Sequence, residues 1–149
     1  MGEARFAHTL FCDDVRQEIG GKLSFMGAYP SGDCVLAAEP PTLIAQLCLV
    51  FWINTAIDDP IGSFTVRVAG SPLGPDPLEH DADVDISLVE KKVDATRVVL
   101  MGVLSLSPVN IVAPGRILVT VDTHREILKA GSLDVLFKAP ESRRPARKT

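Results

Sequence analysis

The 149-residue sequence has few of the features that assign a protein to a class at once. Aromatic residues make up only 5% of the chain, so aliphatic side chains must build most of the core. Stacking platforms for single-stranded nucleic acid are therefore not expected. Three cysteines, Cys12, Cys34 and Cys48, are an odd number with no close pair, which excludes a disulfide framework or a zinc signature. The longest apolar run, Leu47 to Ile53, is far too short to cross a bilayer.

Positive charge is also scarce outside the last ten residues. The chain carries a net charge of −4, of which 140–149 contribute +3 and 1–139 contribute −7. An acidic body repels a phosphate backbone, which argues against nucleic acid as the main partner. The first ten residues lack the apolar run of a signal peptide, so we expect a cytoplasmic protein with buried, reduced thiols and no membrane partner.

What is present fits one globular domain. Hydrophobic residues make up 46% of the chain and charged residues 23%, and a chain of this length buries enough surface to fold without metals or disulfides. We expect a domain over 1–139 and a basic, disordered tail over 140–149. No cofactor motif is recognised.

Short segments rich in β-branched residues, separated by Gly, Pro and Asp, predict strands throughout. The segment Leu43–Asn54 is apolar on both faces, which is typical of a central strand covered on both sides. Ser63–Ala69 alternates, as does Glu79–Val89, where Ala82, Val84, Ile86 and Leu88 are expected to point inward. The segment Gly70–Pro77 is expected to be a loop. Seven to nine strands without a long helix predict an all-β, antiparallel two-sheet β-sandwich, immunoglobulin-like or C2-like in shape.

Residues 14–19 have two interpretations. In the first they continue a strand that turns at Gly20-Gly21 and returns from Lys22 to about Tyr29, with a bulge or a longer loop at the turn. In the second they form one helical turn, with Asp14 as the N-cap and Gly20 as the left-handed end.

The segment from Leu10 to Tyr29 resembles the opening of a bacterial and phage family of short uncharacterised domains. The shared pattern is a Cys-Asp strand, a Gly-Lys turn and a strand of the type Leu-Ser-x-x-Gly-x-Tyr. A late Pro-Gly turn, here Pro114-Gly115, is similar as well. The resemblance implies a β-sandwich and brings no function, although it suggests a phage- or defence-associated setting.

Three acidic residues on the strand predicted over 79–89 are candidate metal ligands. Asp81, Asp83 and Asp85 would share its outward face at intervals of about 7 Å. Calcium needs several oxygen ligands around one point, so this ladder requires Asp58 or Asp59 to join it. The competing interpretation is a solvated face whose charges prevent strand pairing.

A second charged group surrounds the first turn and is the candidate binding site. Its members are Asp13, Asp14, Arg16, Glu18 and Lys22. They form either a charged binding edge or local ion pairs that fix a hairpin. The histidines lie in no catalytic motif, and no nucleophile elbow or phosphate-binding loop is present.

The leading hypothesis is therefore a non-catalytic module that binds a protein partner. The first alternative is a calcium-type metal-dependent domain or small enzyme that uses the surface acidic residues. The second is a structural protein that assembles as a homo-oligomer through exposed sheet edges.

Overall fold

Strands dominate the computed structural model, which describes residues 4–88 and 93–139. These residues contain twelve strands, and their only helical segments are two 3₁₀ turns, η1 (Ser71–Leu73) and η2 (Ile86–Leu88). The all-β prediction is confirmed. The expectation of seven to nine strands is wrong, because predicted strands divide in two. The segment predicted as one strand over Leu43–Asn54 forms Thr42–Ile44 and Leu47–Ala56, and the first strand is broken at Asp13 into Phe6–Cys12 and Asp14–Gln17. The basic tail lies outside the described residues.

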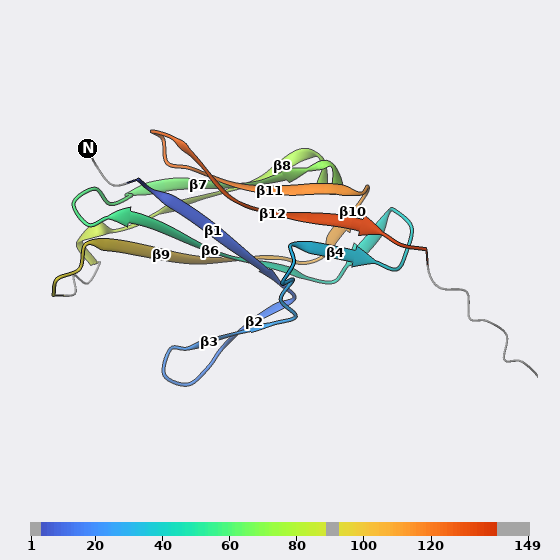
Figure 1. Ribbon diagram of the computed structural model, residues 1–149, viewed down its shortest axis with the longest axis horizontal. Coiled ribbons are helices and arrows are strands. Elements are labelled where there is room, and N and C mark those ends of the chain that lie inside the picture. The colour runs from blue at the N-terminus through green and yellow to red at the C-terminus, as the bar shows by residue number, and fades with distance from the viewer. Residues whose placement is uncertain (1–3, 89–92, 140–149) are drawn as a thin grey trace, which may run out of the picture.

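Three long strands form one antiparallel sheet in the order β1–β6–β9 (Figure 1). They are β1 (Phe6–Cys12), β6 (Leu47–Ala56) and β9 (Arg97–Leu106). In this three-stranded sheet Cys12 lies opposite Cys48, and Val50 lies opposite Val103. Because β9 is the last strand in this order, it forms an edge of the sheet.

The five-stranded sheet has the order β4–β12–β11–β7–β8. Its strands are β4 (Asp33–Leu36), β12 (Ile127–Phe137), β11 (Gly115–Asp122), β7 (Ser63–Gly70) and β8 (Gly74–Asp83). β4 runs parallel to β12, so the expectation of purely antiparallel pairing is wrong at this edge. A separate short pair joins β5 (Thr42–Ile44) to β10 (Val109–Ile111).

The main core is a single cluster to which the three-stranded and five-stranded sheets both contribute. Alternate residues of both sheets point into one cluster, as the period of two in a strand requires. The fully buried side chains of this cluster are Leu47, Leu49, Ile53, Val66, Val68, Ile111, Ile117, Val119, Val121, Leu133 and Val135. Aliphatic residues thus fill the core, as the scarcity of aromatic residues predicted.

A hairpin projects from the body of the molecule and is called the arm below (Figure 1). It pairs β2 (Asp14–Gln17) with β3 (Leu23–Met26), and Gln17 opposite Leu23 is the last pair before the tip. The hairpin interpretation of residues 14–19 is confirmed, and the helical-turn interpretation is wrong. A five-residue tip, Glu18 to Lys22, replaces the strict two-residue turn.

The region from Gly70 to Leu88 departs most from the sequence prediction. The expected loop over Gly70–Pro77 contains η1 and the start of β8. The strand predicted over Glu79–Val89 ends at Asp83, where Asp85 accepts hydrogen bonds from the backbone and hydroxyl of Ser87. Such local side-chain bonds compete with strand pairing. Ile86 and Leu88, predicted inside, are consequently exposed, while Ala82 and Val84 pack against the core; Val89 lies outside the described residues.

Candidate functional site

The root of the arm covers the outer side of β6. A second, smaller cluster buries Cys12, Cys48 and Val50 completely on the side of the sheet opposite the main core. The arm contributes Val15 and Phe25 to this cluster, and the Phe25 and Trp52 rings pack in a T-shaped arrangement with 6.1 Å between centroids. β6 is apolar on both faces because the arm shields its second face from water.

Two of the predicted binding residues hold the root in place. Asp14 Oδ1 accepts a hydrogen bond from Gln46 Nε2 at 3.2 Å, and Asp14 Oδ2 lies 3.7 Å from Arg16 Nε. Asp13 Oδ1 accepts a hydrogen bond from the Tyr29 hydroxyl at 3.1 Å. Gly27, with φ of +65°, lies against the Asp13 carboxylate so closely that a Cβ there would collide with it. Asp13 and Asp14 therefore serve the attachment of the arm.

Partly or fully buried ionisable groups near the root are kept in their neutral forms. Burial raises the pKa of Tyr29 well above its ordinary value, and the neighbouring Cys34 and Asp13 raise it further. Burial likewise raises the pKa of the Cys12 thiol, and Cys48 adds to the effect. The Cys48 sulfur lies 3.2 Å from Gln46 Nε2 and 3.3 Å from Ser105 Oγ. All three cysteines are free and buried, so none of them is positioned as an exposed nucleophile.

The tip of the arm is built for exposure. Ile19 is 99% exposed to solvent, and Glu18 and Lys22 beside it are exposed as well. The Glu18 N–H donates to the Lys22 carbonyl at 2.7 Å and closes the tip. Gly20 and Gly21 adopt the left-handed φ values of +84° and +77°, which glycine tolerates best, and both border open space. The tip thus presents one apolar side chain between two opposite charges.

An apolar surface continues from the arm across the three-stranded sheet. It is called the outer face below and consists of Phe6, His8, Trp52, Val99, Met101 and Val103. Strand register places Trp52 opposite both His8 and Met101, and the His8 and Trp52 rings stack at 4.9 Å. All members except Trp52 are exposed. A contiguous apolar surface of this kind marks an interaction site more often than a scatter of single residues does.

The five predicted binding residues are therefore divided along the arm. Asp13, Asp14 and Arg16 lie at or near the root, while Glu18 and Lys22 lie at the tip. Sequence reasoning found the arm but missed Ile19 and the outer face. The exposure of Ile19 could have been predicted from its position directly before the Gly-Gly turn, because no neighbouring side chain can cover a residue there.

The predicted metal ligands are not gathered around one point. Asp81 and Asp83 lie on β8 and are exposed, and Asp81 accepts a hydrogen bond from Thr65 Oγ1. Asp85 follows the strand and is engaged by Ser87. Among the residues that the structure describes, no three His, Cys, Asp or Glu side chains form a group that could hold a metal ion. The metal hypothesis stays a prediction that this arrangement does not favour.

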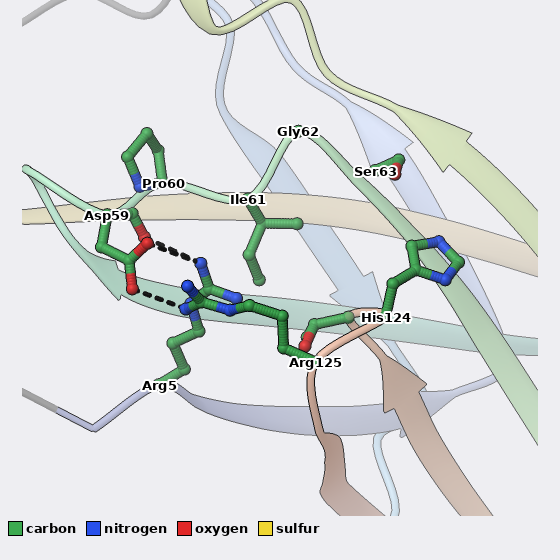
Figure 2. Close-up of a pocket in the computed structure, with 9 residues that line it drawn as sticks. Arg5, Asp59, Pro60, Ile61, Gly62, Ser63, His124 and Arg125 are labelled. Atoms are coloured by element: carbon green, nitrogen blue, oxygen red, sulfur yellow. Dashed lines mark hydrogen bonds and ion pairs between the residues drawn. The ribbon is translucent and has the colours of Figure 1, made fainter.

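An open cavity of about 530 Å³ lies at one end of the molecule, between the β6–β7 and β11–β12 connections. Figure 2 shows Asp59 receiving two guanidinium groups: Arg5 Nη2 lies 3.1 Å from Asp59 Oδ1, and Arg125 Nη2 lies 2.6 Å from Asp59 Oδ2. The Arg125 hydrogen bond, with Arg5 adding to it, holds the pKa of Asp59 below its usual range.

The side chains at this cavity form an ion-pair clip, meaning that the Asp59 carboxylate and two arginines hold distant segments of the chain together. Arg5 precedes β1, Asp59 follows β6, and Arg125 lies in the turn between β11 and β12. The single carboxylate already engages both arginines, and Ser63 and His124 lie to the other side of Ile61 in this view (Figure 2). The cavity therefore joins three segments of the chain through the ion pairs of Asp59.

Scans against protein-family models, curated proteins and solved structures return no match to the chain. In the described part of the chain, no helix is long and apolar enough to cross a membrane.

Proposed function

We propose that the chain is a non-catalytic binding module that engages another protein through the tip of the arm and the outer face. The two larger sheets would form a two-sheet sandwich, immunoglobulin-like or C2-like, that serves as the scaffold. The observation that carries the proposal is the fully exposed Ile19 at the end of a hairpin whose root is tightly packed.

The exposed tip of the arm does not help the domain to fold. A hairpin that leaves an isoleucine in water gains nothing for folding from that side chain, whereas burial in a partner would contribute about 1.5–3 kcal/mol. The root is held by the Val50 cluster and by the Tyr29–Asp13 hydrogen bond, so the tip is presented on an ordered support. Preorganisation of this kind reduces the entropic cost of binding.

The charges at the tip supply specificity for the partner. Glu18 and Lys22 flank Ile19, and exposed charges at the rim of an apolar contact fix register and exclude wrong partners. The expected partner surface is an apolar pocket with charged groups at its rim. Nucleic acid fits this description poorly, because the arm tip carries no excess of positive charge.

The experiment is affinity capture of the tagged protein from its host's lysate, with wild type, Ile19→Asp and Val93→Asp compared side by side. Val93 is 92% exposed and lies in the connection before β9, so it is a matched control for an exposed apolar residue. We expect a stoichiometric partner with wild type and Val93→Asp, weakened at least about tenfold by Ile19→Asp. Equal capture by all three proteins, or no partner at moderate salt, would contradict the proposal.

A further inference from the structure

The two long free edges of the sheets differ sharply in how they are protected. β8, the edge of the five-stranded sheet, carries Pro75 and Pro77 together with Asp76, Glu79, Asp81 and Asp83. Prolines and charges of this kind prevent a further strand from pairing. β9, the edge of the three-stranded sheet, has neither a proline nor a charged residue from Val98 to Leu106.

The unprotected edge borders an apolar groove. A cavity of about 260 Å³ lies between β9 and β8. Its lining is mainly apolar, with Phe51, Phe64, Ala82, Val84, Leu100 and Leu104, and it also includes His80 and the rim segment Met101 to Val103. A strand added beside β9 would place its inward side chains over this groove and its outward side chains beside the outer face. Backbone hydrogen bonds and apolar burial would then act together, as in strand addition generally.

We propose that the occupant of this edge is β9 of a second copy of the chain, paired antiparallel about a two-fold axis that passes Met101. A two-fold axis perpendicular to the sheet keeps outward residues opposite outward residues. Outward residues of β9 are every second residue, so two paired residues are both odd-numbered or both even-numbered, and their numbers sum to an even number. Two such registers retain nine paired residues of β9: one has Met101 at the axis, and the other has Gly102 there.

Side-chain matching selects the register with Met101 at the axis. It places Met101 opposite Met101 and Val99 opposite Val103, so the three exposed apolar residues of β9 cover one another across the two copies. The alternative leaves Val99 opposite Ser105. In the chosen register Arg97 faces Ser105, and no like charges meet anywhere along the pair. The strand, which is uncharged from Val98 to Leu106, is thus complementary to itself.

The resulting dimer would join the two three-stranded sheets into one six-stranded sheet. The outer faces of the two copies would become continuous, with one arm on each side. This inference stands on the edge and the groove. The edge shares Val99, Met101 and Val103 with the outer face, but self-association is measured with no partner present, so its failure is distinguishable from failure of the proposed function.

The test uses charge at the two-fold axis. We expect wild type to have twice the 16.0 kDa chain mass at high micromolar concentration in sedimentation equilibrium. Met101→Lys and Met101→Glu each place like charges directly opposite one another and should each yield a monomer. An equimolar mixture of the two variants should recover a dimer. Leu118→Lys and Leu118→Glu are the controls, since Leu118 is 50% exposed on the other sheet and Met101 is 47% exposed; both should remain dimeric.

A second pair of variants tests the same register without changing Met101, in case the Met101 variants fail to fold. Val99→Lys with Val103→Glu keeps opposite charges facing each other in the proposed register, so this double variant should dimerise. Val99→Lys with Val103→Lys should not. A wild-type monomer at high micromolar concentration would overturn the inference, as would a dimer indifferent to the Met101 charges. Failure of the mixed Met101 variants to associate would overturn the register, and with it the proposal.

Discussion

Replacing Val50 by threonine tests whether the arm covers the outer side of β6. The two side chains have nearly the same shape, but threonine carries a hydroxyl in place of a methyl group. Val50 is fully buried beneath the arm, whereas Val103, directly opposite it on β9, is 40% exposed on the same face of the sheet. Val103→Thr is therefore a control matched in chemistry, sheet face and neighbouring strand, and the comparison is made at a protein concentration at which all three proteins are monomeric.

The expected magnitude follows from burial of the hydroxyl. Moving a hydroxyl out of water without a full hydrogen-bond partner costs about 1–3 kcal/mol in proteins. We expect the free energy of unfolding to fall by that amount for Val50→Thr and by no more than about 0.5 kcal/mol for Val103→Thr. In a chain of this length each kcal/mol corresponds to a decrease of about 2–4 °C in the midpoint of thermal unfolding.

The assay is urea unfolding of wild type and both variants, followed by the fluorescence of the single tryptophan and by circular dichroism. The midpoint of Val50→Thr should move to lower urea while the slope of the transition stays the same. Equal midpoints for Val50→Thr and Val103→Thr would show that water reaches Val50. The arm would then be detached in solution, and the account of its root would be refuted.

Two further predictions concern ionisable groups. Asp59 has a lowered pKa in the folded protein, so its ion pairs stabilise the fold above the unfolded pKa of about 4 and stop doing so as the pH falls through the folded pKa. Asp59→Asn should therefore lower the melting temperature at neutral pH and cease to do so in acid; an equal effect from the exposed control Asp58→Asn would contradict the clip. Tyr29 is the only tyrosine, and its absorbance should show ionisation only well above the ordinary value of about 10, coming closer to that value in Asp13→Asn; normal titration in wild type would contradict its burial.

Local patterns in the sequence predicted much of the strand content. The alternation over Ser63–Ala69 correctly separates buried Phe64, Val66 and Val68 from exposed Arg67, because side chains in a strand repeat every two residues. The apolar run within Leu43–Asn54 is covered on both faces, as predicted. The small residues Ala130-Gly131-Ser132 interrupt the alternation within β12, and the register between β11 and β12 shifts at Ala130.

Long-range pairing could not be predicted in the same way. The arm covers Val50 because a hairpin folds back over the sheet. No spacing of residues in the sequence indicates that contact. Arg5, Asp59 and Arg125 meet across 54 and 66 positions of sequence. Cys12 and Cys48 face one another only because β1 and β6 adopt one particular register.

The end of β8 was missed for a local reason. Asp85 and Ser87 carry the spacing of an Asx turn, which removes the backbone from the strand, but the regular alternation of apolar residues masked that signal. Ile19, the central residue of the proposed site, could not be predicted as a binding residue because its local sequence carries too weak a signal. A single apolar residue beside a turn, such as Ile19, is common on protein surfaces and by itself predicts no binding site, whereas a cluster of charged residues does.

The most direct test of the proposed function is amide hydrogen exchange on the protein alone and in complex with its captured partner. The account predicts that binding slows exchange in the arm, over residues 14–26, and along the three-stranded sheet, while the connections that hold Asp59 and Arg125 exchange as before. Slowing confined to those two connections would place the binding site at the opposite cavity and contradict the central claim.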